Sequence, residues 1–270
     1  MEEIKLLPGQ EWTDATAAWR FVLMRRGAAY WLSAANSRSL AESEMILAAP
    51  GIIVTLRASQ IGEVVLYSFN FAPDLLCGFF TLTERHFLQT GGLEGFRDVE
   101  FLPSTHPVAQ QFAGLTESGF RPGSLTHRVG LLNLVATVFD QAMSRHPAAG
   151  MPGTGVSRRF TQLITQMADT ELINYSPEQL ARLCGCSQRH FNRLFRKRFG
   201  AAPRTHQTEL RLLRARQFLC DTETRIAQVA YESGYRNLSL FNSLFKKRFG
   251  VTPSQYRRNA AITGRQSPQP

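Results

Sequence analysis

The chain has 270 residues, 43% of them hydrophobic, and a formal net charge of +10 at pH 7. A chain of this length fits one or two domains and can bury a substantial core. No stretch approaches the ~18 apolar residues of a membrane span. The N-terminus, MEEIKLLPGQEW, lacks the apolar core of a signal peptide. We therefore expect a cytoplasmic protein with no membrane partner.

The charge is unevenly distributed along the chain. Residues 1–155 carry 11 Lys/Arg and 14 Asp/Glu, a balance of −3, whereas residues 156–270 carry 20 and 7, a balance of +13. Such asymmetry between halves indicates nucleic acid or an anionic surface as a partner of the basic half. The alternative is that the charge serves solubility alone, but it is concentrated in a repeated segment described below.

The N-terminal half predicts a β-domain followed by helices. Between residues 17 and 90, short runs rich in Val, Ile, Phe, Tyr and Trp are separated by turn residues such as Pro50-Gly51 and Gly62. Strands at this spacing favour an antiparallel sandwich or barrel. Helices are predicted over 107–118 and 126–145. The second helix has an apolar stripe formed by Leu131, Leu134, Val135, Val138 and Ala142, with Phe139 beside it.

The N-terminal half offers little catalytic chemistry. One metal needs three or four converging ligands, and the histidines here are each about twenty residues apart and form no HxH pair. We therefore interpret them as isolated surface or turn residues: His86, His106, His127 and His146. We expect no metal, no cofactor and no catalytic residue. A set of aromatic residues could line a ligand cavity, although such residues more often form core: Trp19, Phe21, Tyr30, Trp31, Tyr67, Phe69 and Phe71.

A Pro- and Gly-containing segment, HPAAGMPGTG at 146–155, coincides with the charge boundary and predicts a linker. We therefore expect a domain over 1–145 and a second over 156–260, followed by a disordered tail over 261–270. The second domain reads as helical throughout. Its predicted helices cover 158–172, 177–184, 187–199, 204–219, 225–233, 237–249 and 254–259.

One segment of the second domain occurs twice. FNRLFRKRFGAAP at 191–203 and FNSLFKKRFGVTP at 241–253 are identical at nine of thirteen positions. Each copy follows a short helix and a turn glycine, Gly185 or Gly234, which predicts helix-turn-helix units at about 177–199 and 225–249. The helix between them would be ~27 Å long. Since successive major grooves are ~34 Å apart, one chain could place two recognition helices in successive grooves.

Residues 158–259 resemble the DNA-binding domain of the AraC/XylS family of bacterial transcription regulators. The second copy, IAQVAYESGYRNLSLFNSLFKKRFGVTPSQYR, is close to the signature segment of that family. The N-terminal half resembles the family's cupin-like effector domain in layout. The resemblance implies an α+β fold with two domains: a cupin-like β-barrel or sandwich with C-terminal dimerisation helices, then an all-α domain of two helix-turn-helix units joined by a long helix.

The resemblance also implies a function and partners. We expect a sequence-specific transcription regulator, an activator, that binds promoter double-stranded DNA, contacts RNA polymerase and forms a homodimer. A small molecule or a protein is the expected effector at the N-terminal domain. The dimer interface is expected on the stripe that contains Leu131, Leu134, Val135, Val138 and Ala142.

Carried over position by position, the resemblance implies base readout by eight residues: Gln188, Arg189, Asn192 and Arg193 in the first recognition helix, and Leu238, Ser239, Asn242 and Ser243 in the second. Arg can bind guanine O6/N7, and Asn can bind adenine N6/N7. Ser243 stands where the family commonly has Arg, so we expect weaker or more apolar readout there. The basic runs come later in each helix and are expected at phosphates or solvent: Arg196, Lys197, Arg198, Lys246, Lys247 and Arg248.

Two other classes of function stay open. An enzyme or signal-receptor domain fused to a DNA-binding module is one. The known fusion with alkyl-transfer repair chemistry requires a thiolate-rich zinc site, and Cys77 is the only cysteine in the N-terminal half. A nonspecific architectural DNA binder is the other, and it would differ in its specificity ratio over random DNA.

Overall fold

The computed structural model describes residues 1–33, 37–76, 78–90, 99–117, 124–145, 155–221 and 224–265. Most of the predicted linker, the last five residues of the predicted tail, Cys77 and His146 lie outside this range. The chain divides into two compact units. The N-terminal unit contains Met1–Ala72 and Phe87–Ala149, and the C-terminal unit contains Pro73–His86 and Gly150–Pro270.

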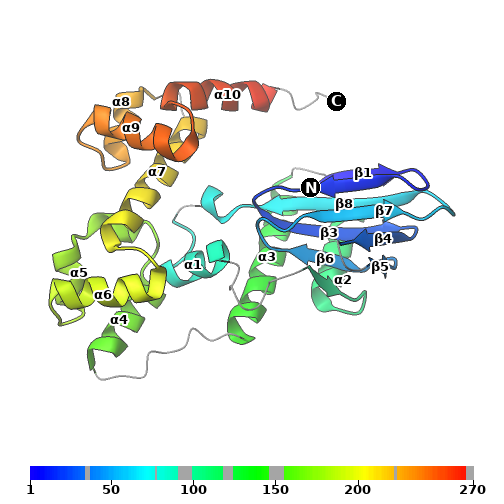
Figure 1. Ribbon diagram of the computed structural model, residues 1–270, viewed down its shortest axis with the longest axis horizontal. Helices are drawn as coiled ribbons and strands as arrows, with labels where there is room; N and C mark the ends of the chain where they lie inside the picture. Colours follow the sequence, from blue (N-terminus) through cyan, green and yellow to red (C-terminus); the bar gives the residue numbers. More distant parts are fainter. Residues whose placement is uncertain are drawn as a thin grey trace. The chain divides into compact units, whose positions relative to one another are not determined.

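The N-terminal unit is built on two antiparallel sheets, as the alternation of apolar runs and turns predicted (Figure 1). Its described strands are β1 (Glu2–Leu6), β2 (Glu11–Asp14), β3 (Trp19–Arg26), β4 (Ala29–Leu32), β5 (Ser37–Leu40), β6 (Met45–Ala48), β7 (Val54–Ala58), β8 (Val64–Phe71) and β9 (Glu100–Leu102). The first sheet has the order β1-β8-β3-β6-β9 and the second has the order β2-β7-β4-β5. The short polar strands β1, β2 and β5 were not predicted.

Strands β3 and β6 of the first sheet are buried on both faces. Between the sheets, Val22 and Ile46 of the first share a core with Trp31 and Leu56 of the second. The opposite face lies under two helices, α2 (Pro107–Leu115) and α3 (Leu125–Arg145). There the rings of Phe139 and Trp19 meet edge-on, with their centroids 4.7 Å apart, and the ring centroids of Phe112 and Phe69 are 5.3 Å apart. Burial on both faces explains the nearly continuous apolar run of β3.

The predicted aromatic set is divided between these layers. Trp19, Phe21 and Phe69 are buried on the face of the first sheet that α2 and α3 cover. Trp31 lies instead between the two sheets. Tyr30 is 44% exposed. The set therefore forms parts of two different layers and does not line one common cavity.

The apolar stripe of α3 also belongs to this core. Leu134, Val135, Val138 and Ala142 are at most 6% exposed, and Leu131 is half-buried. Side chains that are buried within one chain have no surface to offer a second copy, so the predicted dimer interface is corrected here. The amphipathic pattern identified the face that packs on the protein's own sheet.

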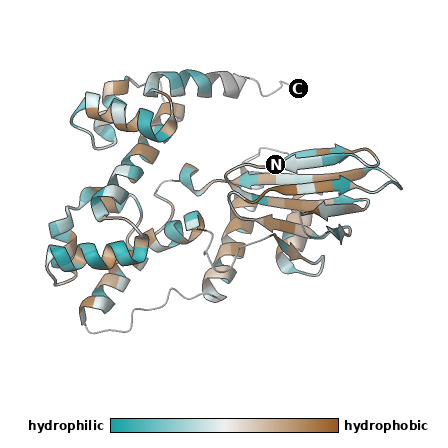
Figure 2. Ribbon diagram, in the orientation of Figure 1, coloured by the Kyte–Doolittle hydropathy of each residue, from teal (hydrophilic) through white to brown (hydrophobic). Residues whose placement is uncertain are grey.

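The C-terminal unit is helical, as predicted. Its described elements are α4 (Gly155–Gln166), the 3₁₀ helix η2 (Glu171–Asn174), α5 (Pro177–Leu183), α6 (Gln188–Phe199), α7 (Pro203–Asp221), α8 (Ile226–Glu232), α9 (Leu238–Phe249) and α10 (Pro253–Arg265). Helix α10 continues through residues 261–265, which were predicted to be disordered. Figure 2 shows α6 and α10 as largely hydrophilic, in contrast to the apolar strands of the sheets.

Each helix-turn-helix unit has its own core. The first core contains Phe191 and Phe195, the second contains Phe241 and Phe245, and α7 contributes to both (Figure 1). Its Leu210 packs in the first core, whereas its Leu212 and Ala215 pack in the second. The long helix therefore joins two separately packed units, as the repeat predicted.

A segment from the N-terminal half completes the first core, and the sequence did not predict it. The 3₁₀ helix η1 (Pro73–Leu75) and the helix α1 (Leu82–Thr90) follow β8. Leu82 is 1% exposed within the first core. Its N–H donates to the Met167 carbonyl at 3.1 Å, and the Asp169 N–H donates to the Phe80 carbonyl at 2.8 Å. This pairing draws the chain out of the helix predicted over 158–172, which ends at Gln166.

An ion pair fixes this segment in place. Nε of Arg85 donates to Oδ2 of Asp169, and both side chains are 0% exposed. A single boundary at 146–155 is therefore incomplete, because the C-terminal unit takes Pro73–His86 from the N-terminal half. In the part of the chain that the structure describes, no helix is long and apolar enough to cross a membrane.

Asp169→Asn should destabilise the full chain by about 3–5 kcal/mol, because it leaves the buried Arg85 without its closest counter-charge. In a full chain that also carries Arg85→Met, the same change should cost much less, because Asp169 then has no buried counter-charge to lose. Denaturant unfolding of the wild type, the two single variants and the double variant measures both differences. Equal costs with and without Arg85 would contradict the role of this ion pair.

Candidate nucleic-acid interface

The turn between the two helices is built alike in both units. The Cys186 N–H donates to the Ala181 carbonyl at 3.0 Å in the first unit, and the Tyr235 N–H donates to the Ala230 carbonyl at 2.9 Å in the second. Gly185 and Gly234 hold φ values of 62° and 88°. Only glycine adopts this left-handed region without strain, which confirms the predicted need for glycine in both turns.

Side-chain caps define where the helices begin. Ser176 and Gln179 form a complete capping box at the start of α5. Ser187 accepts the His190 N–H at the start of α6, and Asn237 accepts the Leu240 N–H at 2.9 Å at the start of α9. These caps set the first turn of each recognition helix, the part that meets base edges in helix-turn-helix proteins.

An arginine packs on each turn glycine, and the sequence did not reveal it. Arg159 comes from α4 and Arg211 from α7, the helices that precede the two helix-turn-helix units. A Cβ atom on Gly185 would lie 2.7 Å from Nη2 of Arg159, and one on Gly234 would lie 3.1 Å from Nε of Arg211. Nε of Arg159 also donates to the Cys184 carbonyl at 2.8 Å. The arginines precede their glycines by 26 and 23 residues, so aligning the repeat does not bring them into register.

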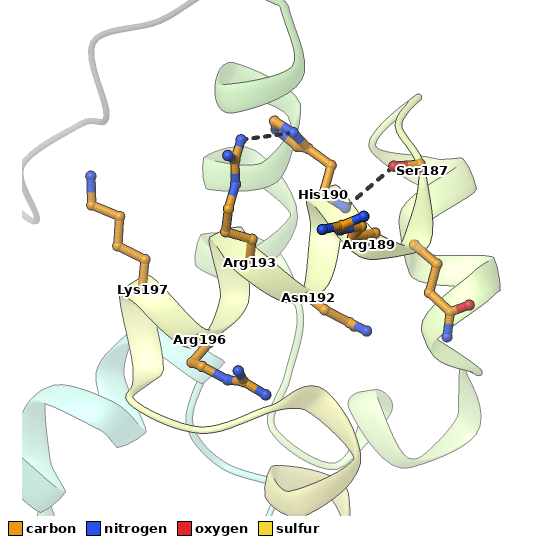
Figure 3. A pocket seen from close by; sticks show the side chains of 8 residues that line it. Ser187, Arg189, His190, Asn192, Arg193, Arg196 and Lys197 are labelled. Carbon is orange, nitrogen blue, oxygen red and sulfur yellow. Dashed lines mark hydrogen bonds between the residues drawn. The ribbon is translucent and has the colours of Figure 1, made fainter.

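The outward face of α6 is cationic. Figure 3 shows its polar side chains around one open concavity, which is lined by Ser187, Gln188, Arg189, His190, Asn192, Arg193, Arg196 and Lys197. Arg189 and Arg193 are exposed, whereas Asn192 is half-buried. Nη2 of Arg193 lies 3.1 Å from Nδ1 of His190. The predicted readers of the first helix therefore share one surface.

The outward face of α9 is more apolar. Leu238 is 42% exposed and Leu240, which the sequence reasoning did not select, is 52% exposed. Ser239 and Ser243 are exposed, and Asn242 is half-buried. Two exposed leucines in the first turn would suit thymine methyl groups better than guanine edges.

The basic runs divide into exposed and engaged residues. Arg196, Lys197, Lys246 and Lys247 are exposed at the ends of the two helices. The third residue of each run is held by the protein itself. Burial lowers the pKa of Arg198, which is half-buried. Nε of Arg248 donates to Oε1 of Glu209 at 2.6 Å.

Two histidines pack against the end of α6. The ring of His86 meets Phe199 edge-on at 5.2 Å, and that of His206 lies 5.5 Å from the same phenyl ring. Burial lowers the pKa of each imidazole to about 4, helped by the charge of Arg198 at His86. Both rings are therefore neutral at pH 7. His86 is thus a packed residue of the first unit, and His127, within α3, is 2% exposed. The interpretation of His86 and His127 as surface or turn histidines was wrong.

Comparison with known proteins shows what the C-terminal domain is similar to. Residues 180–259 match the family model described as a helix-turn-helix domain. The lactose operon transcription activator of Staphylococcus xylosus is 32% identical over 89 residues, 33% of this chain and 32% of that protein. The HTH-type transcriptional regulator GlxA of Rhizobium meliloti (strain 1021) is 32% identical over 113 residues, 40% of this chain and 35% of that protein.

A solved transcriptional regulator with an AraC-type DNA-binding domain, from Chromobacterium violaceum, is 30% identical. The match covers 38% of the present chain and 89% of the solved one, with a TM-score of 0.33. The chain spans about a third of the length of the curated relatives it matches. The C-terminal domain is a helix-turn-helix DNA-binding domain. Its similarity to these two transcription regulators agrees with the resemblance that the repeated helices predicted.

Gly234→Ala should destabilise the protein more than Gly200→Ala. Both glycines have positive φ, but a Cβ meets Arg211 at Gly234 and nothing within 4 Å at Gly200. The backbone strain is about 1–3 kcal/mol in both, and the contact adds to it only at Gly234. Thermal unfolding measures the difference, and adding Arg211→Ala should remove it. An undiminished difference in that double variant would rule out the close approach.

Proposed function

We propose that the protein is a sequence-specific transcription regulator that places α6 and α9 in successive major grooves of promoter DNA. One observation carries the proposal: two capped recognition helices stand at the two ends of α7, each on its own core and each with exposed cations. Pairs of such helices suit direct readout, since an α-helix fits the major groove and presents its N-terminal side chains to base edges.

The proposed contacts follow from exposure. We assign base readout in the first half-site to Gln188, Arg189, Asn192 and Arg193, and in the second to Leu238, Ser239, Asn242 and Ser243, with Leu240 added. Phosphate contacts are assigned to Arg196, Lys197, Lys246 and Lys247, whose side chains are exposed. Arg198 and Arg248 are also proposed to contact phosphates, while Arg198 stays half-buried and Arg248 keeps its hydrogen bond to Glu209.

The sign of regulation and the role of the N-terminal unit are further parts of the proposal. The Staphylococcus xylosus relative is a transcription activator, which supports activation here, and we propose contact with RNA polymerase as part of that role. We propose that the two-sheet unit is a cupin-like domain that receives a small-molecule or protein effector and performs no enzymatic reaction. Its α3 supplies the helix for self-association.

The proposed dimer surface is the exposed side of α3. Leu125, Val129 and Leu132 are 69%, 54% and 36% exposed. Their spacing of four and three residues places them on one face of the helix, away from the buried stripe. A second copy that offers the same face would cover this apolar surface, and an isologous contact of this kind is the commonest in soluble dimers.

Arg193→Ala should weaken binding to the cognate site by about 1–3 kcal/mol and relax specificity at one base pair, because arginine grips one guanine. Lys247→Ala should weaken binding to all sequences alike and reduce the salt slope by roughly one, because lysine neutralises one phosphate. Titrations of both variants on cognate and scrambled DNA at several salt concentrations separate the two roles. Equal loss on both DNAs for Arg193→Ala would refute its assignment.

Val129→Asp combined with Leu132→Asp should convert the full-length protein from a dimer to a monomer, since both changes place charge in the proposed apolar contact. Light scattering at micromolar concentration measures the mass. Thr126→Asp combined with Asn133→Asp is the control. These two exposed residues lie beside the proposed dimer surface, and their substitution adds the same charge. A wild-type monomer, with and without DNA, would refute the proposal.

A further inference from the structure

Residues 73–76 and 78–86, called here the η1–α1 segment, are fixed to the first helix-turn-helix unit at one end. The buried pair of Arg85 and Asp169 provides the charged contact. Oδ1 of Asp169 also accepts the Gly78 N–H at 2.7 Å. Leu82, between these residues, lies in the apolar core of the first unit. This end of the segment therefore behaves as part of the unit that carries α6.

The other end of the segment contacts the second helix-turn-helix unit. The Asp74 carbonyl accepts Nη2 of Arg216, on α7, at 2.7 Å. Oδ2 of Asp74 lies 3.9 Å from Nη2 of Arg248, at the end of recognition helix α9. The guanidinium of Arg216 lies over the ring of Phe249, 5.7 Å from its centroid. Asp74 thus faces both the joining helix and the second recognition helix.

The two ends of the segment are joined to each other. Nη1 of Arg85 lies 3.3 Å from Oδ1 of Asp74, and Nη2 of Arg85 donates to the Leu76 carbonyl at 3.2 Å. A continuous set of charged contacts therefore runs from Asp169 in the first unit to Arg248 in the second. It lies beside α7, which otherwise joins the two cores through one helix.

We propose that Asp74, Arg85 and Arg216 are positioning residues that fix α9 relative to α6, and so set the spacing and phase of the two half-sites on DNA. The inference rests on the proposed function, because it requires both recognition helices on one DNA. A single helix can bend and twist, and a second connection beside it restricts both motions. The positioning residues themselves need not touch DNA.

The segment follows β8 of the N-terminal unit along the chain. Phe71, the last residue of β8, is 7% exposed, and its ring lies 6.1 Å from that of Phe139. Only Ala72 separates it from Pro73, whose ring restricts the backbone. Only Ala72 and Pro73 therefore separate the buried end of β8 from Asp74 along the chain.

The test uses full-length protein and a site that the wild type selects from randomised DNA. One base pair is inserted or deleted between the half-sites, which rotates them by about 35°. The variant is Asp74→Asn with Arg216→Gln, which leaves the net charge unchanged. The control is Glu178→Gln with Arg204→Gln, which removes an exposed, 4.0 Å ion pair of the first unit and is also charge-neutral.

We expect wild type and control to lose at least tenfold in affinity on the altered spacings. The positioning variant should bind the native spacing three- to tenfold more weakly, lose less than threefold on the altered spacings, and bind the first half-site alone as wild type does. Thermal melting of every variant checks the fold. If the positioning variant loses its cooperative melt, Asp74→Ala alone takes its place in the same comparison.

The outcomes separate the two proposals. A wild-type protein with no spacing penalty would overturn both the two-groove function and this inference. A wild-type penalty that the folded positioning variant retains in full would overturn the inference alone. A reduced penalty in the control as well would also overturn it, since the effect would then follow from any lost ion pair.

Discussion

The buried ion pair of Arg85 and Asp169 is the constraint on which the C-terminal unit depends. Removing two charges from water costs several kcal/mol per ion, and only good geometry with further hydrogen bonds offsets that cost. Both conditions are met here: Asp169 also accepts a backbone N–H from Gly78, and Arg85 also contacts Asp74 and the Leu76 carbonyl. The pair joins residues 84 positions apart. The DNA-binding unit is therefore discontinuous in sequence.

The two helix-turn-helix units repeat the same packing with different closing residues. Phe195 and Phe199 of the first unit pack on His206, near the start of α7. Phe245 and Phe249 of the second pack on Tyr256, near the start of α10. The repeat thus extends past the proline that ends each copy, and α10 is the counterpart of the first turns of α7. Because α10 ends the described chain, α7 alone continues into another core.

Local chemistry made part of this structure predictable. Ser176, Ser187 and the turn glycines act within a few residues of their own positions, so the sequence shows them directly. The η1–α1 segment escaped prediction because its burial depends on Asp169 and α7, far away in the chain. The stripe of α3 was identified as an apolar face, but amphipathicity does not say which surface covers it. Arg159 and Arg211 were missed because their packing depends on a turn glycine more than twenty residues further along the chain.

The asymmetry between the recognition helices bears on how the two half-sites would contribute. The exposed face of α6 is cationic, so the contacts proposed for it would combine base readout with attraction to phosphates, and such attraction weakens as salt rises. The first turn of α9 exposes Leu238 and Leu240, and the contacts proposed for them with thymine methyl groups would carry no charge. Discrimination at the second half-site would then depend on shape and position more than on charge. Apolar contacts act only at short range, so their value depends on how firmly α9 is held. A rigid second connection through Asp74 therefore matters most for the helix that has fewer charges with which to bind.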